Sequence, residues 1–244
     1  MMVKMLVEVP VMDFLLIRHG EAEQSTPGWY SQEKRAMDPP LTSRGLRQAL
    51  ALAPRLALLC PSVIVSSDLR RAVQTADAQL AAFECPRIID PAFREIDMGK
   101  VWTRGWDAFP EIHQAWRRHE EEDLPYPGGE NGTDVWNRCR PALEALALYE
   151  TGPIAVVAHG GTIRSIVCGL LGLPQTRRFQ LGGPLENTSL TWVRINSAGD
   201  RAVLHIFNDF SHVCEVDGHQ APPYGYNEIS PSEDPLQKNE DSGG

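Results

Sequence analysis

The chain has 244 residues, of which 42% are hydrophobic and 23% charged, a composition typical of a globular protein with one large domain. Its formal net charge is -9. More than half of this negative charge comes from the segment between Asp217 and Gly244, so the rest of the chain is close to neutral. We therefore expect no nucleic-acid partner, since nucleic-acid binding depends on a basic face.

The cysteines and the N-terminal segment indicate where the protein acts. Five cysteines are spread along the chain without a C-x-x-C pair, which favours reduced thiols over a disulfide framework or a zinc site. The apolar N-terminal stretch is interrupted by Glu8, Pro10 and Asp13, so we expect neither a signal peptide nor a membrane partner. These features predict a cytoplasmic protein.

The first part of the chain alternates between strand and helix patterns. Short apolar runs predict strands over residues 14–17, 62–65 and 87–89. Thr42 is suited to cap the helix between the first two strands, and Pro54 should kink or end that helix. Asp68 is placed to cap the next helix. Residues 21–40, which are polar and contain glycine and proline, predict a loop.

Residues 91–133 are rich in tryptophan, glycine and charge and predict an insertion with a short helix near 111–122. After it, a helix that begins at Thr133 is interrupted by Pro141. The remaining patterns predict a strand over 154–158, a helix over 162–171, and a hairpin of two strands over 189–195 and 203–208.

This order of elements predicts an α/β fold. We expect a doubly wound, mostly parallel sheet with helices on both faces, in three layers, and an antiparallel edge supplied by the hairpin. One domain should cover residues 1–217. Residues 218–244 contain few apolar side chains and an acidic excess, which predicts a disordered tail.

Four basic side chains lie at or just after the carboxyl ends of predicted strands. They are Arg18 and His19, Arg71, and His159. Taken singly, each is more often a surface or core residue than a functional one. In doubly wound sheets, however, ligands bind beyond the carboxyl ends of the strands, so one pocket can collect all four. Guanidinium groups suit phosphate as a planar, bidentate partner, and the four side chains predict a phosphate site.

The motifs that contain these residues resemble those of the histidine phosphatase superfamily, the group related to cofactor-dependent phosphoglycerate mutase. The matching segments follow the family's order between residues 13 and 213 and are LLIRHGEAE (15–23), DPPLTSRGLRQA (38–49), SSDLRRAVQTA (66–76), FREIDMG (93–99), PGGEN (127–131), AHGGTIR (158–164), ENTS (186–189) and FNDFSH (207–212). The resemblance implies the phosphoglycerate mutase-like fold.

The resemblance also implies the roles of the phosphoryl centre. His19 would be the nucleophile and form a phosphohistidine, while Arg18, Arg71 and His159 would hold the oxygens of the phosphoryl group. Attack requires a neutral imidazole, and the neighbouring guanidinium groups favour that form. Because the same groups supply positive charge to the transferring phosphoryl group, we expect neither a metal nor another cofactor.

Outside the phosphoryl centre, the resemblance implies that Glu95 protonates the leaving group and that Glu130 positions the substrate. Asp97 would face the same side as Glu95 on a strand, so it remains an alternative acid. The Trp-Asn pair that commonly follows RHGE in the family is absent here. Ser25 or Thr26 would have to replace its donor, and Ser25 is the candidate for substrate binding.

Three functions remain open at this stage. The first is hydrolysis of a phosphomonoester, and the second is a mutase that returns the phosphoryl group to another hydroxyl of a bound phosphoglycerate. The third is a binding module without catalysis, which the presence of all expected catalytic side chains disfavours. The DPPLTSRG motif and the absent Trp-Asn favour the phosphatase. The residues do not identify the small-molecule substrate. They do not determine the oligomeric state either, and a dimer is possible.

Overall fold

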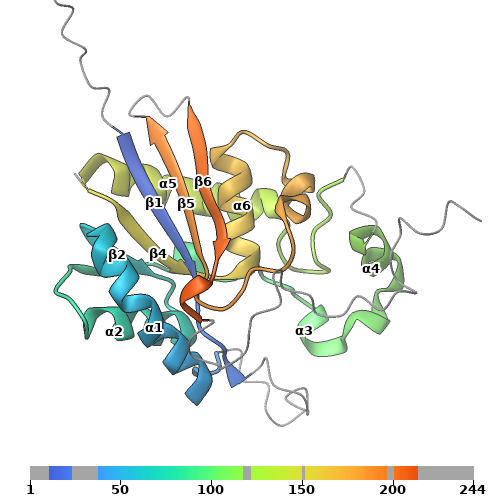
Figure 1. Ribbon diagram of the computed structural model, residues 1–244. Helices are drawn as coiled ribbons and strands as arrows, with labels where there is room; N and C mark the ends of the chain where they lie inside the picture. Colours follow the sequence, from blue (N-terminus) through green and yellow to red (C-terminus); the bar gives the residue numbers. More distant parts are fainter. Residues whose placement is uncertain (1–10, 24–37, 118–121, 150–151, 197–200, 214–244) are drawn as a thin grey trace, which may run out of the picture.

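The computed structural model describes residues 11–23, 38–117, 122–149, 152–196 and 201–213. Its centre is a six-stranded sheet in the order β3-β2-β4-β1-β5-β6 (Figure 1). The strands are β1 (Val11–Arg18), β2 (Val63–Ser66), β3 (Arg87–Ile89), β4 (Ile154–Ala158), β5 (Leu190–Asn196) and β6 (Ala202–Asp209). The first four are parallel, and β5 and β6 are antiparallel to their neighbours. The predicted sheet with its antiparallel edge is confirmed.

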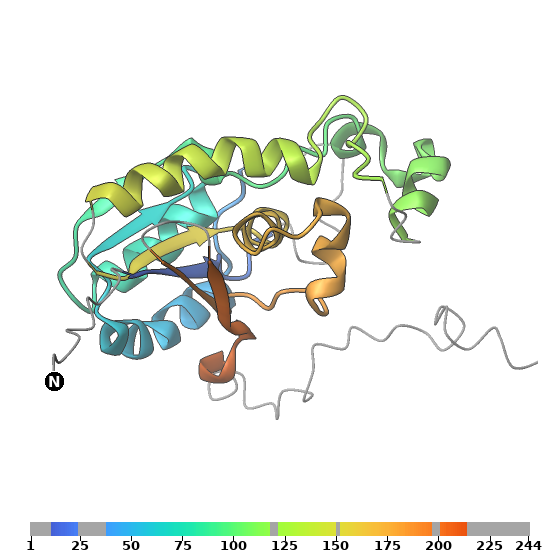
Figure 2. The same ribbon diagram turned by 90° about the horizontal axis from the view of Figure 1, so that it is seen from above.

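The helices cover both faces of this sheet. They are α1 (Ser43–Leu59), α2 (Arg70–Leu80), α3 (Val101–Arg104), α4 (Pro110–Arg117), α5 (Gly132–Tyr149) and α6 (Gly160–Leu170). Strand β1 directs Leu15 and Ile17 into the core with α1 and α2, and Phe14 and Leu16 into the core with α5 and α6. Figure 2 shows α1, in blue, and α5, in yellow-green, on opposite sides of the sheet. The three-layer prediction is therefore confirmed.

The helix starts were predicted with mixed success. Thr42 caps α1, since its hydroxyl oxygen accepts a hydrogen bond from the Gly45 N–H at 2.9 Å. The prediction for Asp68 was wrong, because Leu69 occupies the N-cap of α2 without a side-chain hydrogen bond. The Asp68 carboxylate instead accepts two hydrogen bonds from Arg94, at 2.7 and 2.5 Å. The guanidinium group of Arg94 therefore binds the Asp68 carboxylate in place of a backbone N–H group at the start of α2.

Neither helical proline ends its helix. Helix α1 continues beyond Pro54 to Leu59, and α5 continues beyond Pro141 to Tyr149. A proline removes one backbone hydrogen bond and crowds the preceding turn. Both helices bury apolar side chains before and after the proline, namely Leu52 and Leu56 in α1 and Cys139 and Leu143 in α5. This packing holds the helix on the sheet across the break.

The predicted insertion extends from the sheet as short helices. Helices α3 and α4, drawn in green, project to one side in Figure 1. The predicted helix near 111–122 is described as α4 up to Arg117, and residues 118–121 lie outside the described part of the chain. Where the structure is described, Cys60, Cys85, Cys139 and Cys168 form no disulfide bond, and no helix is long and apolar enough to cross a bilayer. The tail over 218–244 and Cys214 are outside the described residues.

Candidate active site

The four predicted basic side chains converge at one edge of the sheet. Strands β1, β2 and β4 are parallel, so their carboxyl ends meet there. The backbone N–H of His19, directly after β1, donates to the Ala158 carbonyl at the end of β4 over 3.0 Å. This brings the imidazole of His19 to 5.0 Å from that of His159, measured between ring centroids. The structure thus brings these side chains together at the carboxyl ends of the strands.

The hydrogen bonds of His19 define which ring nitrogen is free to react. Its Nδ1 lies 2.7 Å from the Gly20 carbonyl oxygen, which can only accept, so Nδ1 carries the proton. Its Nε2 accepts a hydrogen bond from Nε–H of Arg71 at 3.2 Å. The imidazole is therefore neutral, and its Nε2 lone pair points toward the arginine.

Three polar atoms around His19 are buried without a hydrogen-bond partner in the described structure. They are Nε of Arg18, Nη1 of Arg71 and Nδ1 of His159. Unpaired buried donors are costly and rare in proteins. Arg71 is only 2% exposed and His159 is fully buried. An oxyanion with several acceptor oxygens would satisfy these groups together, which is what phosphate offers.

The surroundings hold both histidines in the neutral form. Burial, followed by the charges of Arg18 and Arg71, lowers the pKa of His19 well below the ordinary histidine value of 6.5. Burial also lowers the pKa of His159, and His19 and the two arginines act in the same direction. A nucleophilic imidazole must be unprotonated, so His19 is prepared for attack at neutral pH.

A consequence for stability follows from the two buried histidines, His19 and His159, and the half-buried His212. Burial also lowers the pKa of His212, to about 4. Below pH 6.5 the unfolded chain takes up protons at these positions while the folded chain does not, so protonation favours unfolding. For each pH unit by which the pH is lowered, each such histidine reduces the free energy of unfolding by up to about 1.4 kcal/mol.

We therefore expect the melting temperature to fall as the pH is lowered from 7 toward 5. Thermal unfolding in a phosphate-free buffer series measures this, because bound phosphate would itself stabilise the fold. His212→Gln, which removes one of the three groups, should make the dependence shallower. A melting temperature that stays constant or rises over this range would contradict the assignment.

Glu95 approaches the same site from the segment after β3. Its Oε1 accepts hydrogen bonds from the backbone N–H groups of Ile96 at 2.9 Å and Thr162 at 3.2 Å. Thr162 lies in the first turn of α6. Burial lowers the pKa of Arg18 and Arg71, and the charge of Glu95 opposes this effect at both. The Glu95 side chain therefore lies close enough to these two guanidinium groups to interact with them.

The other predicted site residues lie in different surroundings. Asp97 is exposed, and its carboxylate accepts from the backbone N–H of Gly99 at 2.8 Å. It does not share a strand face with Glu95, because residues 94–98 form no regular strand. Both carboxylate oxygens of Glu130 bind Arg138. Its role toward substrate stays a prediction, as does that of Ser25, which lies outside the described residues.

Several residues that support the site had no role assigned from the sequence. Ser67, at the end of β2, places its hydroxyl 3.0 Å from Nε2 of His159. The side chain of Asn187 donates to the His19 carbonyl at 3.0 Å, and the N–H of Thr188 donates to the Arg18 carbonyl at 3.0 Å. Both belong to the ENTS motif. That motif therefore holds the backbone of Arg18 and His19.

Gly20 lets helix α1 pack tightly against the loop that follows His19. A Cβ atom at Gly20 would lie 2.5 Å from the Gly45 carbonyl oxygen, which is rigid backbone. A larger residue would push the loop and the helix apart. The glycine of the RHG motif is thus explained by this close approach.

Comparisons with known proteins agree with the geometry. The family model of the histidine phosphatase superfamily (branch 1) matches residues 14–209. A curated Proteus mirabilis protein, named "Probable phosphoglycerate mutase GpmB", is 33% identical over 208 residues, which cover 82% of this chain and 94% of that protein.

Among solved structures, a mycobacterial glucosyl-3-phosphoglycerate phosphatase complexed with VO3 is 31% identical, with a TM-score of 0.70 over 80% of this chain and 98% of that one. A structure described as mycobacterial hydrolase 1 is 29% identical, with a TM-score of 0.71, and the match covers 82% of this chain and 99% of that one. The match to the family model covers the sheet from Phe14 onward and includes Arg18, His19, Arg71 and His159. The chain therefore belongs to the histidine phosphatase superfamily (branch 1).

Proposed function

We propose that the protein hydrolyses a small-molecule phosphomonoester through a phosphohistidine formed on His19. The observation that carries this proposal is the neutral His19 imidazole, whose Nε2 faces Arg71 beside three unpaired buried nitrogen atoms. A neutral imidazole is a nucleophile, and the donors around it match the oxygens of a phosphoryl group.

In the first step, the lone pair of His19 Nε2 attacks phosphorus and the bond to the ester oxygen breaks. The electron pair of that bond stays on the ester oxygen, which takes a proton from the carboxyl group of Glu95 and leaves as the alcohol. The guanidinium groups of Arg18 and Arg71 stabilise the charge on the equatorial oxygens, and His159 contributes through Nδ1.

In the second step, water attacks the phosphohistidine from the position that the alcohol has left. The carboxylate of Glu95 accepts a proton from this water, so the residue returns to its starting form. The bond between phosphorus and Nε2 breaks, its electron pair returns to His19, and phosphate is released. Water is the only co-reactant that the cycle consumes.

A mutase is the second candidate, because the curated relative from Proteus mirabilis is named as a phosphoglycerate mutase. A mutase must retain its substrate and exclude water while the phosphoryl group changes hydroxyl. The phosphatase is favoured by the absence of the Trp-Asn pair after RHGE. The name of a structural relative, a glucosyl-3-phosphoglycerate phosphatase, points in the same direction.

A panel of phosphomonoesters separates the two candidates. It should include 3-phosphoglycerate, glucosyl-3-phosphoglycerate, a sugar phosphate, a nucleotide and a phosphopeptide, with phosphate release and isomerisation measured in the same samples. We expect phosphate release from at least one ester and no faster isomerisation of 3-phosphoglycerate. Isomerisation that outpaces release would assign the protein to the mutases.

The same panel tests the proposed source of positive charge. The guanidinium groups of Arg18 and Arg71 take the place that metal ions have in many phosphoryl-transfer enzymes. Rates measured after dialysis against a strong chelator should therefore equal those before it. Loss of activity that returns with Mg²⁺ or Mn²⁺ would contradict this part of the proposal.

A further inference from the structure

The segment that carries Glu95 has no regular secondary structure to hold it. The short 3-10 helix η3 (Pro91–Phe93) comes directly before it, and residues 94–98 belong to neither a helix nor a strand. An acid must lie within hydrogen-bond reach of the leaving oxygen to protonate it. The position of Glu95 therefore depends on contacts that other elements make with this segment.

Arg138, on helix α5, binds three backbone carbonyl groups of the segment. Its Nη1 donates to the Ala92 carbonyl oxygen at 2.5 Å, and its Nη2 donates to those of Arg94 at 2.9 Å and Glu95 at 3.3 Å. The planar guanidinium group of Arg138 thus holds the stretch of backbone that leads into Glu95. A lysine has one ammonium group and could not reach all three acceptors in this geometry.

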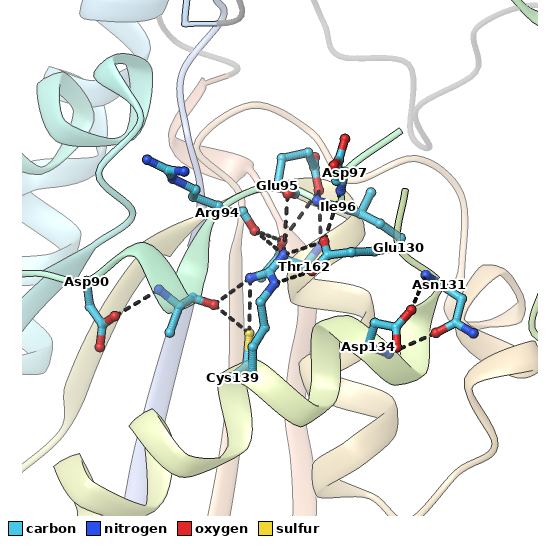
Figure 3. Close-up of polar contacts among 12 residues, drawn as sticks. Asp90, Arg94, Glu95, Ile96, Asp97, Glu130, Asn131, Asp134, Cys139 and Thr162 are labelled. Carbon is cyan, nitrogen blue, oxygen red and sulfur yellow. Dashed lines mark hydrogen bonds and ion pairs between the residues drawn. The ribbon is translucent and has the colours of Figure 1, made fainter. Parts of the chain in front are cut away.

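Glu130 in turn holds the guanidinium group of Arg138. Its Oε1 accepts from Nε at 2.7 Å and its Oε2 from Nη2 at 3.0 Å, which is a bidentate ion pair. Oε2 also accepts from the backbone N–H of Asp97 at 2.9 Å, as seen in Figure 3. Arg138 and Glu130 together bind the segment on both sides of Glu95, and we call them the Arg138–Glu130 clamp.

The clamp is charged and partly shielded from water. Burial raises the pKa of Glu130, but hydrogen bonds from Arg138 and from the backbone of Asp97 outweigh it, so the pKa is lowered overall. Both side chains are 24% exposed, in contrast to the surface pair of Arg140 and Glu144, where the values are 56% and 66%. A shielded bidentate pair has a fixed geometry that an exposed pair lacks.

We infer that Arg138, supported by Glu130, is a positioning residue that sets the place of the Glu95 carboxyl group. This inference rests on the proposed function, because it assumes that Glu95 is the proton donor. The side chains proposed to bind phosphate come from β1, α2 and the end of β4, and the hydrogen bonds of the clamp do not reach them. The main effect of the clamp is therefore on protonation and not on phosphate binding.

The segment keeps other anchors when the clamp is removed. The Thr162 hydroxyl donates to the Arg94 carbonyl at 2.6 Å, and the Cys139 thiol donates to that of Ala92 at 3.0 Å. Loss of Arg138 should therefore shift Glu95 rather than release it. A displacement of about 1 Å from the reactive geometry can cost about 10²-fold in rate.

The first test compares two esters that differ in their need for an acid. For Arg138→Gln we expect kcat/KM to fall by about 10- to 100-fold with β-glycerophosphate, a poor leaving group, and by less than about threefold with 4-nitrophenyl phosphate. Inhibition by inorganic phosphate should be unchanged. Arg140→Gln, on the same helix but exposed, should change none of these values. Equal losses with both esters would indicate a merely structural role and overturn the inference.

The second test asks whether Arg138 acts through Glu95. In a Glu95→Gln background no proton remains to be positioned, so adding Arg138→Gln should cause little further loss with β-glycerophosphate. A further loss as large as that in the wild type would overturn the inference. Glu130→Gln, which weakens the clamp from its other side, gives the same comparison and serves in its place if Arg138→Gln does not fold.

Failure of the inference is distinguishable from failure of the proposed function. If Glu95→Gln alone loses activity equally with both esters, the proposed proton donor is wrong. If Glu95→Gln is selective for β-glycerophosphate but neither clamp variant is, the proposed function stands and the clamp has no positioning role.

Discussion

Replacing His19 with alanine should reduce turnover of every phosphomonoester by about 10⁴-fold or more, as removal of a covalent nucleophile does in other enzymes. The neutral Nε2 of His19 is the atom that would form the bond to phosphorus, and Nε2 of the neighbouring His159 cannot replace it because it is paired with the Ser67 hydroxyl. The variant leaves the core of the sheet intact, so it should fold. Turnover of the best substrate from the panel, with circular dichroism as a check on folding, measures the effect.

His205→Ala provides the matched control, because this histidine is exposed on β6, at the edge of the sheet. Its kcat/KM should equal that of the wild type. A folded His19→Ala sample should not retain activity within about tenfold of the wild type, because the protein has lost its nucleophile. Such a result would overturn the account.

Glu95→Gln should have the second-largest effect, and its size should depend on the leaving group. We expect kcat/KM to fall by about 10²-fold or more with an alkyl phosphate, whose alcohol needs a proton to depart, and by much less with a phenolic ester. Glutamine keeps the side-chain length but cannot supply the proton. The hydrogen bonds that Oε1 accepts from Ile96 and Thr162 can persist with an amide oxygen.

Asp97→Asn serves as the comparison for this effect. Asp97 is exposed and caps a turn at Gly99, so its substitution should not depend on the leaving group. The reverse pattern, with Asp97→Asn selective and Glu95→Gln unselective, would transfer the role of the acid to Asp97.

The placement of the candidate site could be predicted from the sequence because its residues follow the ends of parallel strands. Arg18, His19 and His159 directly end or follow apolar strands, and parallel strands place such residues at one edge. The alternation of strands and helices predicted the layers for the same reason. Hydrophobic periodicity and the order of the elements along the chain can both be read from the sequence. Together they indicate where a residue that follows a strand must lie.

The parts that could not be predicted depend on contacts between distant segments. Arg138 binds the Ala92 carbonyl across 46 residues, and a backbone carbonyl leaves no mark in the sequence. Asp68 fits the pattern of a helix cap, yet its carboxylate binds Arg94, which is 26 residues away. Local patterns give candidates for such polar groups, but the partner is decided by the packing of the whole fold.

The continuation of α1 past Pro54 has a similar cause. The local cost of a proline is real, but the buried face of the helix extends on both sides of it. Tertiary burial outweighs that cost, and only the position of the helix on the sheet reveals it. Proline therefore predicts a local weakness in a helix better than it predicts the end of one.

The account rests on a covalent intermediate on His19, and trapping that intermediate tests it most directly. The enzyme is mixed with a ³²P-labelled substrate from the panel, quenched within milliseconds in alkali, which preserves phosphohistidine, and digested for mass spectrometry. The account predicts label on the peptide that contains His19, lost on acid treatment and missing from His19→Ala. Turnover without any trapped label, or acid-stable label on another residue, would contradict it.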